Sequence, residues 1–126
     1  MTMNPVPSAD LPQIPGLEEY IDLQDGLGRI RGNRKIYKTL LQSFLNKNNM
    51  EELKTQIVEN NLEDAAKSVH TIKGVSANLS LTALNKSMIE LEAQVKTGSY
   101  KEETYKESLE IFANTTDFIS MLLQQL

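Results

Sequence analysis

The chain contains a single histidine, His70, whose surroundings are unusual for an exposed helix surface. At about 100° per residue, the imidazole points away from the apolar side of its helix, and its neighbours there are small: Ala66, Gly74 and Ala77. A glycine inside a helix costs about 1 kcal/mol relative to alanine, but a side chain at position 74 would lean over the ring. Lys73 adds a cation one turn away. An unobstructed imidazole beside a cation suits nucleophilic attack on a phosphoryl group.

The helix that carries His70 is expected to span residues 61–79. Asn61 can cap its start, and its apolar positions recur at helical spacing. They cluster within an arc of about 100° that defines the face toward the core: Leu62, Ala65, Val69, Ile72, Ser76 and Leu79.

The rest of the chain predicts an all-α fold. All four prolines lie within the first fifteen residues, and none follows. Residues 1–16 are therefore expected to be a Pro-rich linker or disordered tail, and residues 17–126 a single helical domain. Short turns between four main helices favour an antiparallel up-down four-helix bundle, with a short helix or cap formed by residues 17–30.

Local signals place the other helices. Asn33 can cap the first, with Ile36, Leu40, Phe44 and Leu45 on its inner side, and residues 47–49 mark a kink or break. Ser80 or Thr82 can begin the third helix, and residues 99–102 form a capping box for the last. The last helix carries one apolar stripe: Tyr105, Leu109, Phe112, Thr116, Ile119, Leu123 and Leu126.

Composition excludes several classes of protein. With 13 basic and 17 acidic residues, the net charge of −4 lacks the positive field that nucleic-acid binding needs. The absence of cysteine excludes disulfide scaffolds and thiol nucleophiles. Adjacent acidic pairs such as Glu51-Glu52 point apart on a helix, so no metal site is predicted. Without a signal-like start or a long apolar run, we expect a cytoplasmic protein with no direct membrane contact.

The stretch from His70 to Leu79, HTIKGVSANL, resembles the signature of histidine phosphotransfer (HPt) domains, roughly H-x-[IL]-K-G-x-[SA]-x-x-[LIFV]-G. Residues 25–37 are similar to the D-G-L-x-R-x-x-G-N-x-x-x-Y segment of the HPt domains at the C-terminus of bacterial hybrid sensor histidine kinases. The likeness covers residues 17–95. One departure is Ser80, where the family usually has glycine; Ser80 could instead cap the next helix.

The resemblance implies a phosphorelay intermediate. His70 would accept a phosphoryl group from an aspartate of a response-regulator receiver domain and pass it to another, with Lys73 balancing charge. Glu92, 22 residues later on the neighbouring helix, would orient the imidazole, although a solvated surface acid is an equal alternative. Mg²⁺ would come from the partner, and the chain would be a phosphocarrier rather than a kinase by itself. The expected receiver-docking residues share the solvent side of the helix: Ala66, Lys67, Thr71, Gly74, Ala77 and Asn78.

Two alternatives remain. A helical bundle that only binds a partner would leave His70 incidental, although His70, Lys73 and Gly74 together argue against it. The dimerisation and phosphoacceptor domain of a histidine kinase would carry a different motif, with an acidic residue beside the histidine and a proline downstream. Here Thr71 follows the histidine. We therefore expect a monomer, which a parent sensor kinase could tether to the inner membrane.

Overall fold

The computed structural model describes residues 11–126 and confirms the all-α fold class. Along this part of the chain there are helices and turns but no strand, and none of these helices is long and apolar enough to cross a membrane. The elements are η2 (Leu17–Glu19), α1 (Leu23–Gly28), α2 (Arg34–Asn46), α3 (Met50–Val58), α4 (Leu62–Asn78), α5 (Thr82–Val95) and α6 (Glu102–Leu123).

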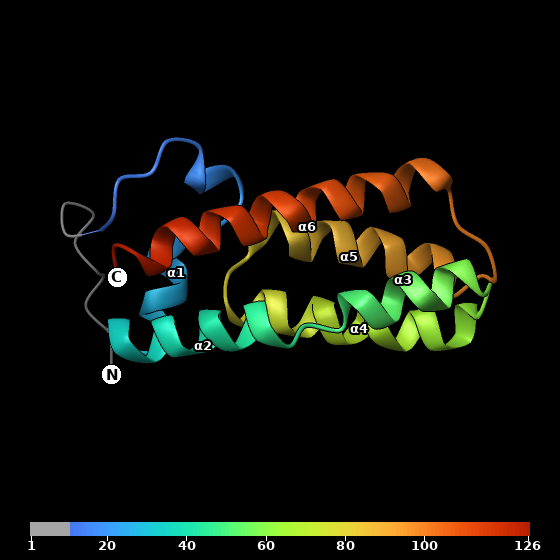
Figure 1. Cartoon of the computed structure of the whole chain (residues 1–126), viewed down its shortest axis with the longest axis horizontal. Coiled ribbons are helices and arrows are strands. Elements are labelled where there is room, and N and C mark those ends of the chain that lie inside the picture. Colours follow the sequence, from blue (N-terminus) through green and yellow to red (C-terminus); the bar gives the residue numbers. More distant parts are fainter. Residues whose placement is uncertain (1–10) are drawn as a thin grey trace.

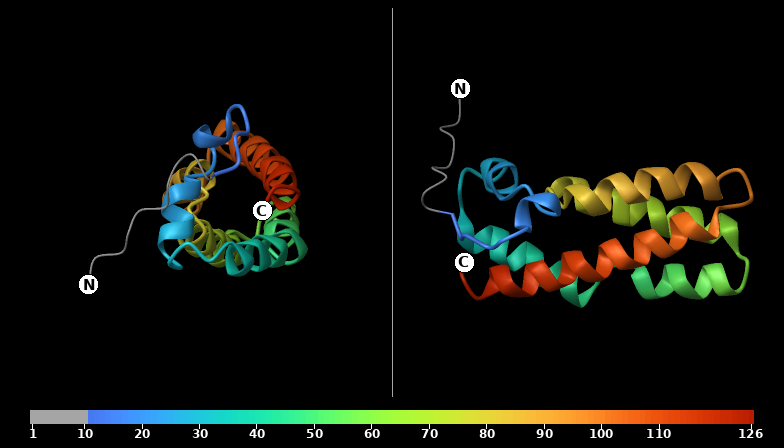
Figure 2. Two further views of the ribbon diagram at one scale, coloured as in Figure 1. Left: turned by 90° about the vertical axis from the view of Figure 1, so that its left-hand side faces the viewer. Right: turned by 90° about the horizontal axis from the view of Figure 1, so that it is seen from above.

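The helices form an antiparallel four-helix bundle, as predicted. Helices α4, α5 and α6 alternate in direction, and α2 and α3 follow one another to form the fourth arm (Figure 1). Seen along the bundle axis, α5 lies between α4 and α6, and the α2–α3 arm closes the ring between α6 and α4 (Figure 2). The short helices η2 and α1 lie across one end of the bundle.

A break separates α2 from α3, where the sequence predicted a kink or break. Asn49 has a left-handed backbone (φ 60°), which asparagine tolerates better than most residues. The Asn48 side chain donates to the Phe44 carbonyl (2.8 Å) and accepts from the Met50 amide (3.1 Å). These bonds satisfy backbone groups that the interruption frees, so the arm bends without leaving them unpaired.

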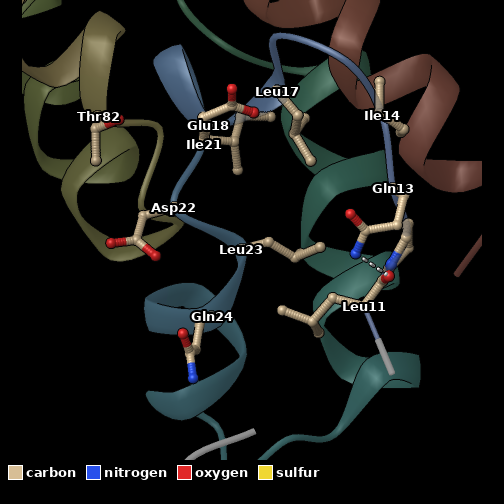
Figure 3. Close-up of a pocket in the computed structure, with 11 residues that line it drawn as sticks. Leu11, Gln13, Ile14, Leu17, Glu18, Ile21, Asp22, Leu23, Gln24 and Thr82 are labelled. Atoms are coloured by element: carbon tan, nitrogen blue, oxygen red, sulfur yellow. Dashed lines mark hydrogen bonds between the residues drawn. The ribbon is translucent and has the colours of Figure 1, made fainter. Parts of the chain in front are cut away.

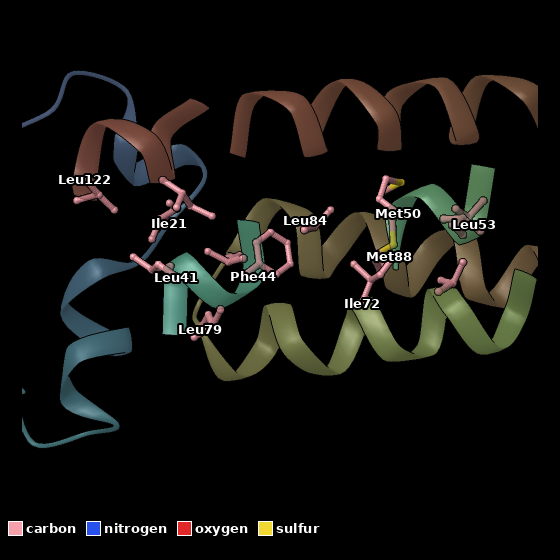
Figure 4. Packing of buried hydrophobic residues seen from close by; sticks show 14 of the residues in the cluster. Ile21, Leu41, Phe44, Met50, Leu53, Ile72, Leu79, Leu84, Met88 and Leu122 are labelled. Atoms are coloured by element: carbon pink, nitrogen blue, oxygen red, sulfur yellow. The ribbon is translucent and has the colours of Figure 1, made fainter. Parts of the chain in front are cut away.

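Buried side chains from every arm meet along the bundle axis (Figure 4). The predicted inner face of α4 is confirmed, except that Leu62 is only partly buried. The predicted inner face of α2 is partly wrong. Tyr37, Leu41 and Phe44 face the core, whereas Ile36 and Leu40 are 47% and 41% exposed. The buried tyrosine explains this rotation of the helix, because a pattern of aliphatic residues alone does not reveal which side an aromatic ring will take.

The predicted stripe of α6 is also displaced. Its buried positions are Thr104, Ser108, Thr115, Ile119 and Leu122, while the larger predicted residues, such as Tyr105 and Phe112, are only partly buried. The Ser108 and Thr115 hydroxyls donate to carbonyls one turn earlier, at 2.9 and 2.7 Å. Small side chains whose hydroxyls are satisfied within their own helix can therefore occupy the core face.

The predicted helix starts have mixed outcomes. Asn33 and Asn61 cap α2 and α4 by accepting from the Ile36 and Asp64 amides (3.1 and 3.3 Å). The capping box at residues 99–102 is wrong, because α6 begins after Lys101 without a side-chain cap. Of the two predicted starts of the third helix, Thr82 is correct, because α5 begins there, and the predicted cap at Ser80 is wrong. Ser80 has a left-handed backbone (φ 57°) and donates to Asp25 (2.5 Å). That φ explains why glycine suits this position in similar domains.

The Tyr37 side chain joins α2 to the end of α4. Its buried hydroxyl donates to the Leu79 carbonyl at 2.7 Å, and burial raises the pKa of Tyr37, so the hydroxyl stays protonated. A Cβ at Gly26 would lie 2.7 Å from that hydroxyl, so only glycine fits there without moving the ring. Gly26 therefore leaves room for the Tyr37 ring, and the Tyr37 hydroxyl holds the Leu79 carbonyl at the end of α4.

Of the predicted linker at residues 1–16, residues 1–10 lie outside the described part of the chain. Ile14 is buried, and Leu11 packs against the core from the segment before η2. Within the described residues, packing against the bundle therefore begins before Leu17.

We expect Tyr37→Phe to lower the free energy of unfolding by about 1–2 kcal/mol, because the buried Leu79 carbonyl loses its donor. Urea denaturation measures this difference. Tyr100→Phe is the matched control, because Tyr100 is only partly buried, and it should change stability by less than about 0.5 kcal/mol. Equal effects of the two substitutions would contradict the proposed anchoring.

Candidate functional site

His70 lies in the middle of α4 and projects into solvent, with 68% of its side chain exposed. One turn further, a Cβ built on Gly74 would have no atom within 4 Å. The helix therefore has open space above the ring, as the sequence predicted. No packing requirement explains a glycine at this position.

Glu92 holds the imidazole from the neighbouring helix α5. Only 6% of its side chain is exposed, and its Oε2 lies 2.8 Å from His70 Nδ1. Lys73 Nζ donates to the other carboxylate oxygen at 2.5 Å. Of the two alternatives for Glu92, the structure thus contradicts the solvated surface acid. It also places the half-buried Lys73 on Glu92 rather than free beside the ring.

The protonation of Glu92 determines which ring nitrogen is free. Burial by itself raises the pKa of the Glu92 carboxyl, but hydrogen bonds from Lys73 and His70 and the charges of Lys73 and Lys96 outweigh burial and lower it. The carboxyl is therefore ionised at neutral pH and can only accept hydrogen bonds. His70 Nδ1 must then carry the proton, which leaves the Nε2 lone pair of the neutral ring available.

Sequence reasoning missed Lys96, a second cation at the same carboxylate. Its Nζ lies 3.6 Å from Glu92 Oε2, the oxygen that faces the imidazole. The i,i+4 spacing of Glu92 and Lys96 on one helix was a readable signal for this pair. Two ammonium groups and one carboxylate leave one excess positive charge beside a neutral imidazole, which favours the approach of an anion.

Asn85 links α5 to α4 at Lys73, three residues after His70, and no sequence pattern indicated this role. Its side-chain amide donates to the Lys73 carbonyl at 2.9 Å, and the Ser76 hydroxyl donates to the same carbonyl at the same distance. The Asn85 bond joins the two helices one turn from His70 and helps to hold Glu92 opposite the ring, whereas the Ser76 bond lies within α4.

The predicted docking residues share the surface around His70, with one difference. Lys67, Thr71, Gly74, Ala77 and Asn78 are exposed. Ala66 is only partly buried and packs against the core. The Lys67 ammonium lies 3.6 Å from the Asp64 carboxylate, so its charge is partly balanced.

A separate hollow of about 490 Å³ lies at the end of the bundle where η2 and α1 pack (Figure 3). Its lining comes from residues 11–24 and Thr82, and it includes no residue of α4. Among residues 11–126, no three histidine, aspartate or glutamate side chains are grouped to hold a metal ion. Because 68% of the His70 side chain is exposed and no atom lies within 4 Å of a Cβ at Gly74, the His70 site is an open surface, which suits a macromolecular partner better than a small substrate.

A family model described as "Hpt domain" matches residues 39–126, which is more than half of the chain. The matched region contains His70, Lys73, Glu92 and Lys96. Comparison with curated proteins found no match, and comparison with solved structures found none either.

We expect the stability that Glu92 contributes to depend on pH. Its pKa is lower in the folded chain than the ordinary value of 4.5, so the contribution is complete above that value and is lost as the pH falls through the folded value. At pH 7, Glu92→Gln should lower the free energy of unfolding by about 1–2 kcal/mol, because two ammonium groups lose their carboxylate.

Urea denaturation from pH 7 to pH 3 tests this expectation, and the difference between wild type and Glu92→Gln should shrink toward low pH. Glu90→Gln, on the exposed side of α5, is the control and should show a small difference at every pH. A constant difference for Glu92→Gln over this range would contradict the ionised carboxylate.

Proposed function

Because this chain belongs to the Hpt domain family, whose members transfer phosphoryl groups in phosphorelays, we propose that His70 is the residue that carries the phosphoryl group. The observation that carries this proposal is the contact between His70 Nδ1 and the ionised Glu92, which leaves Nε2 free and exposed. No other histidine exists in the chain.

In the proposed step, the Nε2 lone pair attacks the phosphorus of a phosphorylated aspartate on a receiver domain. The N–P bond forms as the P–O bond to the aspartyl oxygen breaks, and that bond's electron pair leaves with the carboxylate. The ring becomes a cation that keeps its Nδ1 proton, hydrogen-bonded to Glu92. Transfer to a second receiver reverses these bond changes. Such reactions depend mainly on positioning and on neutralisation of charge.

Glu92 and the two lysines have different electrostatic roles in the proposed transfer. When the ring is phosphorylated and positively charged, the carboxylate stabilises that charge and holds the proton on Nδ1. When the phosphoryl group then leaves Nε2, the ring is released as a neutral imidazole. Lys73 and Lys96 supply positive charge for the phosphoryl oxygens. Lys73 is held by Glu92 in the free protein, and its flexible stem allows the ammonium to turn toward a phosphoryl group.

The partner in this proposal is a receiver domain, which docks over the open surface around Gly74 and supplies Mg²⁺. The chain then acts as a phosphocarrier and not as a kinase by itself. We further propose that it works as a monomer in the cytoplasm. Similarity in residues 25–37 supports a place at the C-terminus of a hybrid sensor kinase.

The direct experiment is incubation with a receiver domain phosphorylated with radioactive acetyl phosphate. Wild type should acquire label that is labile in acid and stable in base, as expected for a phosphoramidate. His70→Gln should acquire none and should still fold, because 68% of the His70 side chain is exposed and Glu92 keeps its contacts with Lys73 and Lys96. Label on His70→Gln would contradict the assignment.

Substitutions at Gly74 can separate an effect on the stability of the fold from an effect on the rate of phosphoryl transfer. Because open space surrounds a Cβ at this position, Gly74→Ala should raise the free energy of unfolding by about 0.5–1 kcal/mol, and Gly74→Leu should also fold. Gly74→Leu should nevertheless slow transfer from the receiver at least about tenfold, because its side chain leans toward His70. Quench-flow kinetics measures the rate.

Ala113→Leu, on the exposed face of α6, is the matched control and should transfer at the wild-type rate. If Gly74→Leu transferred as fast as this control, the open space above the ring would have no role in docking.

A further inference from the structure

Two lysines lie at the Glu92 carboxylate, but the structure holds them differently. The Lys73 ammonium donates to Oε1 at 2.5 Å, and 29% of the Lys73 side chain is exposed. The Lys96 ammonium lies 3.6 Å from Oε2, just beyond hydrogen-bond distance, and 61% of its side chain is exposed. One lysine is therefore bound to the carboxylate, and the other lies beside it in solvent.

Phosphorylation of His70 would make a second demand on Lys73. A phosphoryl group on Nε2 adds about two negative charges to the site. In the free protein, Lys73 shares a carboxylate with Nδ1, so its ammonium lies on the Nδ1 side of the ring. The phosphoryl oxygens would lie beyond Nε2. Lys73 must therefore leave Oε1 before its ammonium can contact them.

The departure of Lys73 would leave the Glu92 carboxylate short of a partner. The imidazolium would still donate from Nδ1 to Oε2, but Lys73 is the one donor to Oε1 among residues 11–126. Only 6% of the Glu92 side chain is exposed, so water can replace little of the lost hydrogen bond. An unpaired buried carboxylate is unfavourable, and this cost would oppose phosphoryl transfer unless another cation approached.

Lys96 is placed to be that cation. It follows Glu92 by four residues, and glutamate before lysine at this spacing lets the two side chains meet. Its backbone amide bonds to the Glu92 carbonyl at 3.1 Å, which fixes the base of its side chain relative to the carboxylate. Within the described part of the chain, its ammonium has no other ion-pair partner to leave. A small movement of the flexible stem is therefore enough for a hydrogen bond.

We propose that Lys96 is a positioning residue that takes the place of Lys73 on Glu92 while His70 carries the phosphoryl group. This inference rests on the proposed function of His70. In the phosphorylated site, Lys73 pairs with the phosphoryl oxygens, and Lys96 and the imidazolium pair with Glu92. Each anion then has a cation, and Glu92 orients the ring in both states. When the phosphoryl group leaves, Lys73 returns to Oε1 and Lys96 to solvent.

Nitrogen-15 NMR of the lysine ammonium groups observes this exchange directly. The full chain is compared before and after reaction with phosphoramidate, which passes its phosphoryl group to the imidazole and releases ammonia. A hydrogen-bonded ammonium is less mobile than a solvated one. Lys96 should therefore be mobile before phosphorylation and restrained after it, and the Lys73 signal should shift. Lys86, an exposed lysine on the same helix, is the control and should stay mobile throughout.

Kinetics with a phosphorylated receiver domain tests whether the exchange matters. Lys96→Met should slow transfer at saturating receiver about tenfold, because the buried carboxylate loses one charged hydrogen bond after docking. The receiver concentration at half-saturation should change less than about twofold. Lys96→Arg should restore most of the rate, because a guanidinium also pairs with a carboxylate. Lys86→Met, which removes the same charge from the same helix, should transfer at the wild-type rate.

The tautomer of unphosphorylated His70 shows whether Lys96 has a merely structural role. It should be the same in Lys96→Met as in wild type, because Lys73 still holds Glu92 in that state. A changed tautomer would contradict the proposed exchange.

Three other results would also overturn the inference. These are a Lys96 ammonium as mobile in the phosphorylated protein as before, equal transfer rates for Lys96→Met and Lys86→Met, and an effect of Lys96→Met confined to half-saturation, which would assign Lys96 to docking. Each leaves the assignment of His70 intact. If neither donor labels wild-type His70, the proposed function fails instead, and the inference fails with it. The two failures are therefore distinguishable.

Discussion

The site depends on one buried carboxylate that binds three groups from two helices. Glu92 contacts His70 and Lys73 across the α4–α5 junction and Lys96 on its own helix. Removing a carboxylate from water is unfavourable unless each oxygen has good partners, and here both oxygens have them. The same contacts that make burial tolerable also orient the imidazole and gather positive charge around it. Stability and chemistry therefore depend on the same interaction.

The bundle supplies the geometry that this interaction requires. The Tyr37 hydroxyl fixes the end of α4, and the left-handed Ser80 begins the tight connection to α5. Asn85 then joins the two helices one turn from the histidine. The order of helices in the ring also places the α2–α3 arm beside α4, which α3 contacts directly (Figure 2). The packing of the bundle thus determines where the imidazole ring stands.

Much of this could be predicted from the sequence, because the helices are regular. The exposure of His70 follows from its angle on the helical wheel, and the open space at Gly74 follows from the missing side chain. Asn33 and Asn61 cap their helices with local bonds that a sequence signal describes well. The resemblance to HPt domains suggested a role for Glu92, 22 residues after His70, but only the structure shows that the two side chains meet.

Two of the predictions that were wrong involve contacts between distant parts of the chain. Ser80 bonds to Asp25, 55 residues away, instead of capping its own helix. Ile36 and Leu40 are exposed because Tyr37 takes the inner position, which depends on the space left by Gly26. In α6, Ser108 and Thr115 can face the core because each hydroxyl donates to the carbonyl four residues earlier in the same helix. Periodicity assigns a face to a helix, but its exact rotation is set by partners that the pattern does not contain.

The most direct test of the account is the tautomer of His70, measured by long-range ¹H–¹⁵N NMR correlation at a pH where the imidazole is neutral. We expect the proton on Nδ1 and a bare Nε2 in wild type, with this preference weakened in Glu92→Gln. A ring protonated mainly on Nε2, or the same tautomer mixture in wild type and Glu92→Gln, would contradict the claim that Glu92 prepares the nucleophile.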